Sequence, residues 1–280
     1  MTISELIIIM LSLFGMALLM IRILMCVETR DRSKKKQSIR WDTGASKTIG
    51  DRELQEDEYG ITEAEKGILA VLADGQGKEY GGKIAGRLAV QVFQDLFEDR
   101  AAFYNPHYYF RKAFQAANHE ILKELDEGQG SASVGAVLIK DKLLYYAVVG
   151  NVKVAVYRNR ELVPVSLGHT ISVLAQQKYQ EGSLTKQETA ALLEYHRLYN
   201  FVGQDGFHDV EFFDTPITLR GGEYVVLMSD GIYETARWKD IEDCLEKEGS
   251  CQQKAFRIVE LVNESQKEEK DNASVVVIKV

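Results

Sequence analysis

Acidic side chains stand at the ends of apolar runs at three places in this chain. Asp74 follows the run GILAVLA and precedes Gly75, and Asp230 follows the run EYVVLMS. Asp271 precedes Asn272, just before the final run SVVVIKV. Such runs are typical of buried strands, so the three carboxylates would face one another if these strands are neighbours. Carboxylates that gather without partners are costly unless cations neutralise them, so the pattern predicts a metal site.

A fourth acidic segment lies upstream, in the sequence RELQEDEYG. It contains Glu56 and Asp57, and Arg52 stands four residues before Glu56. Carboxylate oxygens, with water in the remaining positions, are the ligands that Mg²⁺ or Mn²⁺ prefers. Two such ions close together can clamp a phosphoryl group and activate water. Each Asp-Gly pair alone is better explained as a turn, so only the joint placement indicates a site.

The stretch LADGQGKEYGGKIAG, residues 72–86, allows three interpretations: a glycine-rich phosphate cradle, a turn into a helix, or a metal-binding corner. A Walker loop would require Gly-Lys-Ser/Thr at a fixed distance, which is missing here, and the spacing is not G-x-G-x-x-G either. The cradle is therefore disfavoured, and the residues of this stretch leave the turn and the metal corner open.

Composition favours a globular protein in a reducing compartment. The 280 residues are 45% hydrophobic and 27% charged, which suits one large domain or two small ones with a sizeable core. A net charge of -8 argues against nucleic-acid binding, which needs a basic face. The three cysteines, Cys26, Cys244 and Cys251, lack the spacing of a metal site.

Periodicity predicts an α+β fold. Strands that follow one another through short turns, with paired helices beside them, are typical of antiparallel layers rather than of a parallel doubly wound sheet. The predicted strands are 67–73, 134–139, 143–150, 154–158, 223–229 and 274–280. The predicted turns are 140–142 and 158–160, and the predicted helices are 83–100, 111–127, about 185–196 and about 252–268.

The N-terminal segment predicts a membrane anchor. The run LIIIMLSLFGMALLMI begins at Leu6 and resumes as ILMCV after Arg22, which together is long enough to cross a hydrocarbon core of ~30 Å. The basic residues follow the apolar run and no A-x-A-like site appears, which disfavours a cleaved signal peptide. By the positive-inside rule the body is expected in the cytoplasm, on a single-pass anchor in the cell membrane. The expected organisation is a transmembrane helix over 1–27, whose residues 6–27 contact lipid, a basic linker over 28–43, and a catalytic domain over 44–280.

Taken in order, the motifs of the body resemble those of the metal-dependent serine/threonine protein phosphatases of type 2C, in their bacterial form. The resemblance covers the chain from about Ile49 to Val280. It is carried by Arg52-x-x-Gln55-Glu56-Asp57, Ala73-Asp74-Gly75-Gln76-Gly77 with Gly82 and Ala85, Gly130-Ser131-Ala132-Ser133-Val134, Val149-Gly150-Asn151, Leu167-Gly168-His169-Thr170, Glu181-Gly182-Ser183-Leu184-Thr185, Ser229-Asp230-Gly231 and Asp271-Asn272.

The resemblance implies a four-layer α-β-β-α sandwich with a dimetal site in a cleft at one end. It implies that two Mn²⁺ or Mg²⁺ ions are bridged by Asp74, and that Arg52 grips the substrate phosphate. The stretch 72–86 would then be a metal corner, in which Asp74 ends a strand, the glycines allow a turn and a helix starts at Lys83. The implied catalytic residues are Arg52, Asp74 and Asp230, and the implied metal ligands, some of them through water, are Glu56, Asp57, Asp74, the Gly75 carbonyl, Asp230 and Asp271.

The implied activity is hydrolysis of phosphoserine and phosphothreonine in proteins by water activated between the two metals, with a serine/threonine kinase as the natural counterpart. Asn151 stands where the family usually has an Asp that binds a third metal, and an amide is a poorer ligand for a hard cation, so a third site is not expected. Two alternatives stay open. One is a pseudophosphatase that binds phosphoproteins without turnover, and the other is a phosphatase whose substrate is the antagonist of an anti-sigma factor.

Overall fold

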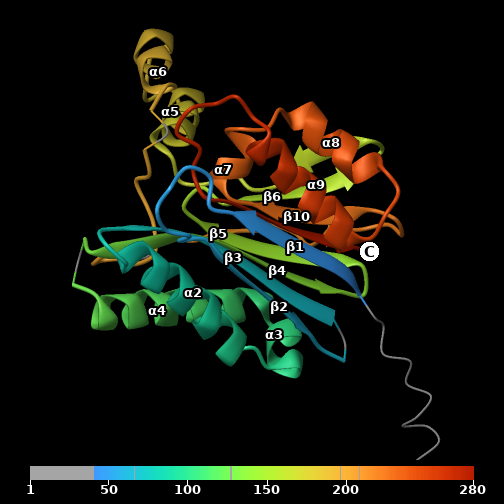
Figure 1. The fold of residues 1–280 in the computed structure, drawn as a ribbon. Coiled ribbons are helices and arrows are strands. Elements are labelled where there is room, and N and C mark those ends of the chain that lie inside the picture. The colour runs from blue at the N-terminus through green and yellow to red at the C-terminus, as the bar shows by residue number, and fades with distance from the viewer. Residues whose placement is uncertain (1–40, 66, 127, 196, 208) are drawn as a thin grey trace, which may run out of the picture. The chain divides into compact units, whose positions relative to one another are not determined.

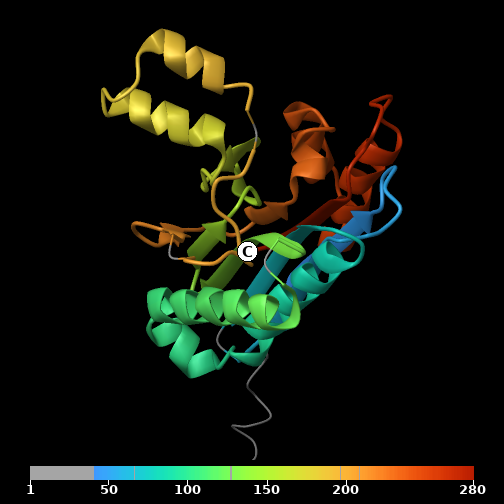
Figure 2. The ribbon, with the colours of Figure 1, turned by 90° about the vertical axis from the view of Figure 1, so that its left-hand side faces the viewer.

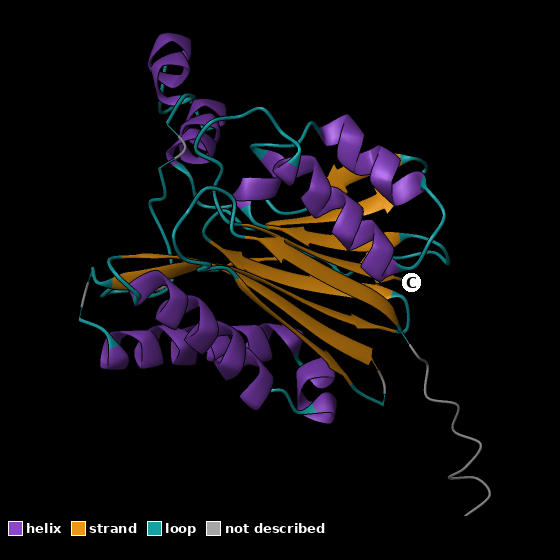
Figure 3. Ribbon diagram, viewed as in Figure 1, coloured by secondary structure: helices purple, strands orange, loops and turns teal. Residues whose placement is uncertain are grey.

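The computed structural model describes residues 41–280, except residues 66, 127, 196 and 208. Two antiparallel sheets lie face to face, and helices cover the outer face of each (Figures 1 and 3). The first sheet has the order β1-β11-β10-β6-β7, and the second has the order β2-β3-β4-β5-β8, with β9 also paired to β5. This confirms the antiparallel α+β sandwich expected from the sequence.

The strands of the two sheets have the following bounds. The first sheet contains β1 (Asp42–Thr48), β6 (Lys153–Arg158), β7 (Glu161–Pro164), β10 (Tyr224–Met228) and β11 (Ala273–Lys279). The second sheet contains β2 (Glu58–Glu63), β3 (Gly67–Gly77), β4 (Gly130–Lys140), β5 (Leu143–Val149), β8 (Glu211–Phe212) and β9 (Ile217–Thr218).

Two sets of helices form the outer layers, and a third set stands apart. The second sheet is covered by α2 (Gly81–Asp95), α3 (Asp99–Tyr104) and α4 (Pro106–Glu124). The first sheet is covered by α7 (Asp230–Tyr233), α8 (Trp238–Glu246) and α9 (Cys251–Asn263). The helices α5 (Ile171–Gln180) and α6 (Lys186–Leu192) pack on each other and project away from the sandwich (Figure 2).

Alternation along the strands explains the four layers. In β11, Val276 and Ile278 lie in the hydrophobic core between the sheets, whereas Val275 and Val277 lie in a second core beneath α8 and α9. Successive side chains of a strand point to opposite faces, so a strand covered on both faces reads as a continuous apolar run. The runs that the sequence shows are therefore central strands of a covered sheet.

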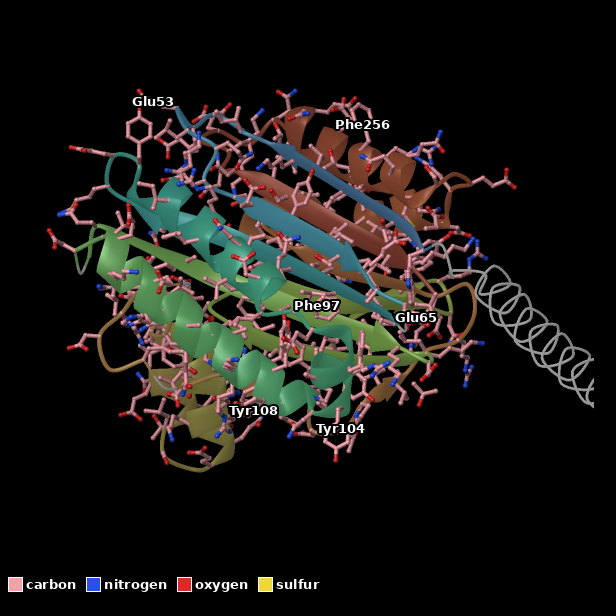
Figure 4. The ribbon with its side chains drawn as sticks, turned by 90° about the horizontal axis from the view of Figure 1, so that it is seen from below. Glu53, Glu65, Phe97, Tyr104, Tyr108 and Phe256 are labelled. Carbon is pink, nitrogen blue, oxygen red and sulfur yellow. The ribbon has the colours of Figure 1, made fainter. Side chains whose placement is uncertain are left out.

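Aromatic packing joins the helices that cover the second sheet. Phe97 follows α2 and meets the rings of Phe103 and Tyr109 edge-on, with centroids 5.9 and 6.0 Å away. Tyr104 and Tyr108, at the junction of α3 and α4, are instead 89% and 65% exposed. All of these helices lie on the face seen in Figure 4. This layer supports the sheet that carries Asp74.

Several predicted ends of strands and helices differ from those in the structure. β3 does not end at Ala73 but runs to Gly77, because its residues 74–77 pair with residues 130–133 of β4. The turn falls at 78–80, and α2 starts at Gly81 rather than Lys83. The predicted helix 83–100 is two helices, α2 and α3, and the helix expected near 185–196 is limited to α6, with α5 before it unforeseen.

The predicted turns at 140–142 and 158–160 are present. Asp141, Lys142, Asn159 and Arg160 have φ values of 50°, 62°, 51° and 67°. Two consecutive residues with positive φ are typical of the tight turns that join antiparallel strands.

The predicted membrane anchor and nearly all of the basic linker lie outside the described residues. Among residues 41–280, apart from the four gaps, no helix is long and apolar enough to cross a membrane. The folded body begins with β1 at Asp42, two residues before the expected start of the catalytic domain at Gly44.

Candidate active site

An acidic cavity of about 530 Å³ opens at one end of the sandwich. Both sheets contribute to its wall. Asp74 belongs to β3 of the second sheet, whereas Asp230 follows β10 and Asp271 precedes β11, which are strands of the first sheet. As the sequence predicted, these three carboxylates line one cavity, although Asp74 lies within β3 rather than at its end. The predicted site residues that line the cavity are Arg52, Glu56, Asp74, Gly75, Asp230 and Asp271.

The glycines after Asp74 are needed for close packing rather than for a turn. A Cβ on Gly75 would collide with the carbonyl oxygen of Gly82 and would lie 2.8 Å from that of Glu56. A Cβ on Gly82 would meet the carboxylate of Glu56. These glycines let the start of α2 and the Glu56 loop lie directly against β3, so that Glu56 reaches the cavity beside Asp74.

Asp230 is the first residue of α7, and hydrogen bonds to it and to the preceding residue fix its position. Asn151 donates a hydrogen bond from Nδ2 to Oδ2 of Asp230 at 2.8 Å. The preceding residue, Ser229, donates from Oγ to Oδ2 of Asp57 at 2.8 Å and accepts from the Ser274 N–H at 2.8 Å. Asp57 is only 2% exposed and does not line the cavity. In this structure it holds the turn that presents Asp230.

The loop that carries Arg52 and Glu56 is fastened to the start of β11. The Asn272 side chain accepts from the Glu56 N–H at 2.7 Å and donates to the Ile49 carbonyl at 2.8 Å. Arg52 donates from Nη2 to Oδ2 of Asp271 at 2.8 Å, and both side chains are about half exposed. Exposed ion pairs of this kind add little stability, so a competing anion can displace Asp271 from Arg52 at low cost.

Burial raises the pKa values of the acidic groups at this site. Burial, followed by the charge of Asp230, raises the pKa of Asp74 well above its usual range. Burial and the charge of Asp271 raise the pKa of Asp230, and burial raises that of Asp57 to about 7. The pKa of Glu56 is raised by burial and by Asp271, although the Lys83 N–H at the start of α2 opposes the shift. The carboxylates therefore require either protons or nearby positive charge.

The donor set fits hard divalent cations. As they stand, no three acidic, histidine or cysteine side chains of the described region converge into a ready metal cluster. The carboxylates of Asp74 and Asp230 are nevertheless desolvated, and repulsion from neighbouring carboxylates raises their pKa values. Oxygen ligands of this kind, in a cavity with room for water, suit Mn²⁺ or Mg²⁺.

The remaining wall of the cavity was not predicted as part of the site. Ser131 and Ser133 of β4 contribute to it, as do Gln76 and Gly77 of β3. The segment that returns from α6 adds Arg197, Leu198 and Phe201. The motifs around Ser131, Ser133, Gln76 and Gly77 were visible in the sequence, but 197–201 contains no pattern that would mark it.

Fold and site together are those of a protein serine/threonine phosphatase of the PPM type. The chain belongs to the protein phosphatase 2C family, which matches residues 44–270. The membership confirms the resemblance and the class of enzyme expected from the sequence.

The relatives of the chain are bacterial. It is 24% identical over 213 residues to the serine/threonine phosphatase stp of Listeria welshimeri, covering 73% of this chain and 82% of that protein. Its fold is similar to that of the S. agalactiae serine/threonine phosphatase, with a TM-score of 0.74, 22% identity and coverage of 86% of this chain and 100% of the other. It is also similar to the catalytic domain of the phosphatase PstP in complex with two manganese ions, with a TM-score of 0.64, 22% identity and coverage of 85% and 97%.

Proposed function

We propose that this protein hydrolyses phosphoserine and phosphothreonine in proteins at a centre that holds two Mn²⁺ or Mg²⁺ ions. The observation that carries the proposal is the acidic cavity at the end of the sandwich, in which desolvated carboxylates from both sheets face one space beside Arg52. A site with this much unpaired negative charge cannot receive a phosphate dianion until cations have neutralised it.

The residues assigned to hold the ions are those that the resemblance implied, except Asp57, which does not line the cavity. Asp74, the Gly75 carbonyl, Glu56, Asp230 and Asp271, all of which line the cavity, would hold the ions. Asp57 accepts a hydrogen bond from the Ser229 hydroxyl and thereby keeps the adjacent Asp230 in place. When bound, the ions supply the charge that binds the phosphoryl oxygens and that activates water at neutral pH.

Arg52 is assigned to the substrate phosphate. Its guanidinium lines the cavity from the loop before β2, and its present partner, Asp271, is half exposed and readily displaced. The planar fork of the guanidinium can donate two parallel hydrogen bonds to phosphoryl oxygens. It thereby orients the phosphorus for in-line attack and stabilises the charge on the equatorial oxygens.

The proton for the leaving hydroxyl has no evident source among the side chains of the cavity. Gln76 lines the wall beside Asp74, but an amide does not act as a general acid near neutral pH. Ser131 and Ser133 can orient water by hydrogen bonding, and solvent is then the proton donor.

The N-terminal segment is proposed to tether the enzyme to the cell membrane, with the phosphatase domain in the cytoplasm. Its support is the apolar run 6–27 and the basic run that follows it. A membrane location would bring the enzyme close to a membrane-bound serine/threonine kinase and its substrates. Carbonate-washed membranes should retain the full chain and lose a chain that lacks residues 1–27.

Metal titration tests the central proposal. The full chain, stripped of metal, should release phosphate from a phosphothreonine peptide in a saturable response to Mn²⁺. Asp230→Asn should abolish the release, whereas Asp141→Asn, in an exposed turn, should retain it. Activity that survives in Asp230→Asn would contradict the assignment. Binding of Mn²⁺ without any release of phosphate would instead favour a phosphoprotein-binding module that has no turnover.

A further inference from the structure

A second pocket, of about 520 Å³, lies beside the catalytic cavity. The two share Asn151, which lines both, so an occupant of one is close to an occupant of the other. The walls of the second pocket come from the start of β6, the start of α5, the end of α7 and the segment after α9. Its polar lining includes Lys153, Thr170, Ser172, Glu234 and Lys267.

Lys153 is a cation without a close anionic partner. It is half-buried, and its ammonium lies 4.6 Å from the centre of the Tyr233 ring. Within the described part of the chain it makes no hydrogen bond, and no carboxylate oxygen comes within 4 Å of it. The carboxylate of Glu211 accepts from the N–H groups of Leu167 and Gly168, each at 2.8 Å. It and Glu234 act on Lys153 only through space, without direct contact. A partly desolvated ammonium in this position favours an incoming anion.

Lys267 provides a second positive charge in the same pocket. Its ammonium donates to the Glu234 carbonyl at 3.3 Å, which leaves two of its three donors for other groups. The hydroxyls of Thr170 and Ser172 lie 2.9 Å apart and can donate to an anion by rotation. Glu234 is the acidic residue among those that line the pocket, so its lining carries two positive charges and one negative charge, and Glu211 acts on Lys153 from outside the lining.

We propose that the Lys153 pocket binds an anionic side chain of the phosphoprotein substrate while the phosphorylated residue occupies the catalytic cavity. The anion is a carboxylate or a second phosphate, a few residues away along the same chain. The inference rests on the proposed function for the nature of the occupant. The wall between the two positions is firm, because Tyr233 donates from its hydroxyl to the Asn151 carbonyl at 2.8 Å. Leu167, 61% exposed at the rim, offers apolar contact to the connecting residues.

Peptide binding tests the inference without requiring turnover. The labelled peptides carry a non-hydrolysable phosphonate analogue of phosphothreonine, and their binding to the full chain with Mn²⁺ is followed by fluorescence anisotropy. One peptide has neutral flanks, one set has a glutamate scanned along both flanks, and one set has a second phosphonate analogue scanned likewise. We expect the best anionic peptide to bind about five- to tenfold more tightly than the neutral peptide, which is the net contribution of one typical hydrogen bond in water. The glutamate and phosphonate sets distinguish the two anions.

Variants assign the preference to the pocket. Lys153→Met keeps the apolar stem and removes the charge, and it should abolish the preference while leaving binding of the neutral peptide unchanged. Lys267→Gln should weaken the preference, and Lys112→Met, on the exposed face of α4, should leave it intact. In turnover assays the preference should appear in KM and not in kcat.

Two results would overturn the inference: equal binding of all peptides by the wild-type chain, or a preference that survives both pocket variants. If Lys153→Met does not fold, Lys267→Gln decides the question alone. A preference that depends on the lysines in a chain that releases no phosphate would refute the proposed hydrolysis and uphold the pocket.

Discussion

Asn151 donates a hydrogen bond from its amide to the buried carboxylate of Asp230 at 2.8 Å. The amide is neutral, it stands at the connection between β5 and β6, and its own oxygen is buried without a donor among the described residues. A carboxylate at the same position would face Asp230 with like charge. Asn151 therefore reduces the positive charge that this side of the cavity needs.

We predict that Asn151→Asp destabilises the metal-free protein. The substitution removes the amide donor and places a second negative charge against Asp230, at a cost of about 2 kcal/mol. For a domain of this size that corresponds to a fall in Tm of roughly 4–8 °C. Thermal unfolding in a chelator measures this fall in Tm. Addition of Mn²⁺ should restore most of the lost stability, because the cation neutralises the added charge. Asn159→Asp, in an exposed turn, is the control, and an equal loss in both variants would contradict the prediction.

A second prediction concerns Gly75. Its Cβ position is occupied by backbone atoms of Gly82 and Glu56, which cannot rotate away as a side chain could. Gly75→Ala should therefore push the start of α2 and the Glu56 loop off β3, at a cost of at least about 3 kcal/mol, at the upper end for single substitutions. Gly221→Ala is matched, because nothing lies within 4 Å of its Cβ. Urea unfolding of the two variants should differ accordingly, and equal midpoints would show that α2 adjusts.

The buried carboxylates predict how pH acts on the metal-free chain. The folded-state pKa of Asp57 is about 7, above its usual value near 3.8, and those of Asp74 and Asp230 are also raised. Groups with raised pKa values contribute stability that is present below about pH 4 and is lost as the pH rises towards 7. The Tm in a chelator should therefore fall over this range, relative to the Tm with saturating Mn²⁺. If the difference between the two Tm values stays constant from about pH 4 to 7, ionisation of these acids does not destabilise the metal-free chain.

His169 has the opposite influence. Its ring is 7% exposed, and Nδ1 accepts a hydrogen bond from the Gly150 N–H at 3.1 Å, which requires a neutral ring nitrogen. Burial lowers the pKa of His169. The contribution of this residue is present above about pH 6.5, the usual value for the unfolded chain, and is lost as the pH falls through the lower folded-state pKa.

Comparison of His169→Gln with the wild-type chain isolates this effect. With saturating Mn²⁺, the stability that wild-type protein loses between about pH 7 and 5 should be smaller in His169→Gln, because glutamine does not ionise. His119→Gln, on the exposed side of α4, should behave as wild type. Parallel pH profiles for all three proteins would show that ionisation of His169 does not contribute to the pH dependence of stability.

Periodicity in the sequence was sufficient to predict the central strands and the long helices. β10 and β11 are apolar on both faces, and α4 and α9 bury one face each, so each segment alone reveals its burial. β1, with the sequence DTGASKT, offers no such pattern. It is a strand because its backbone pairs with β11 over seven residues. Pairing of this kind depends on a partner more than 200 residues away and leaves no local trace.

The same distinction runs through the site. The sequence by itself determined which carboxylates border the apolar runs, and hence that Asp74, Asp230 and Asp271 could meet. Only the tertiary structure decided that Asp74 lies inside β3, that Asp57 is buried behind Ser229, and that Asn151 reaches Asp230 from 79 residues away. Side-chain type and local spacing report the chemistry that a residue can perform. Which groups it faces is set by the order of strands in the two sheets, because hydrogen-bonded pairing brings together residues that are distant in the chain.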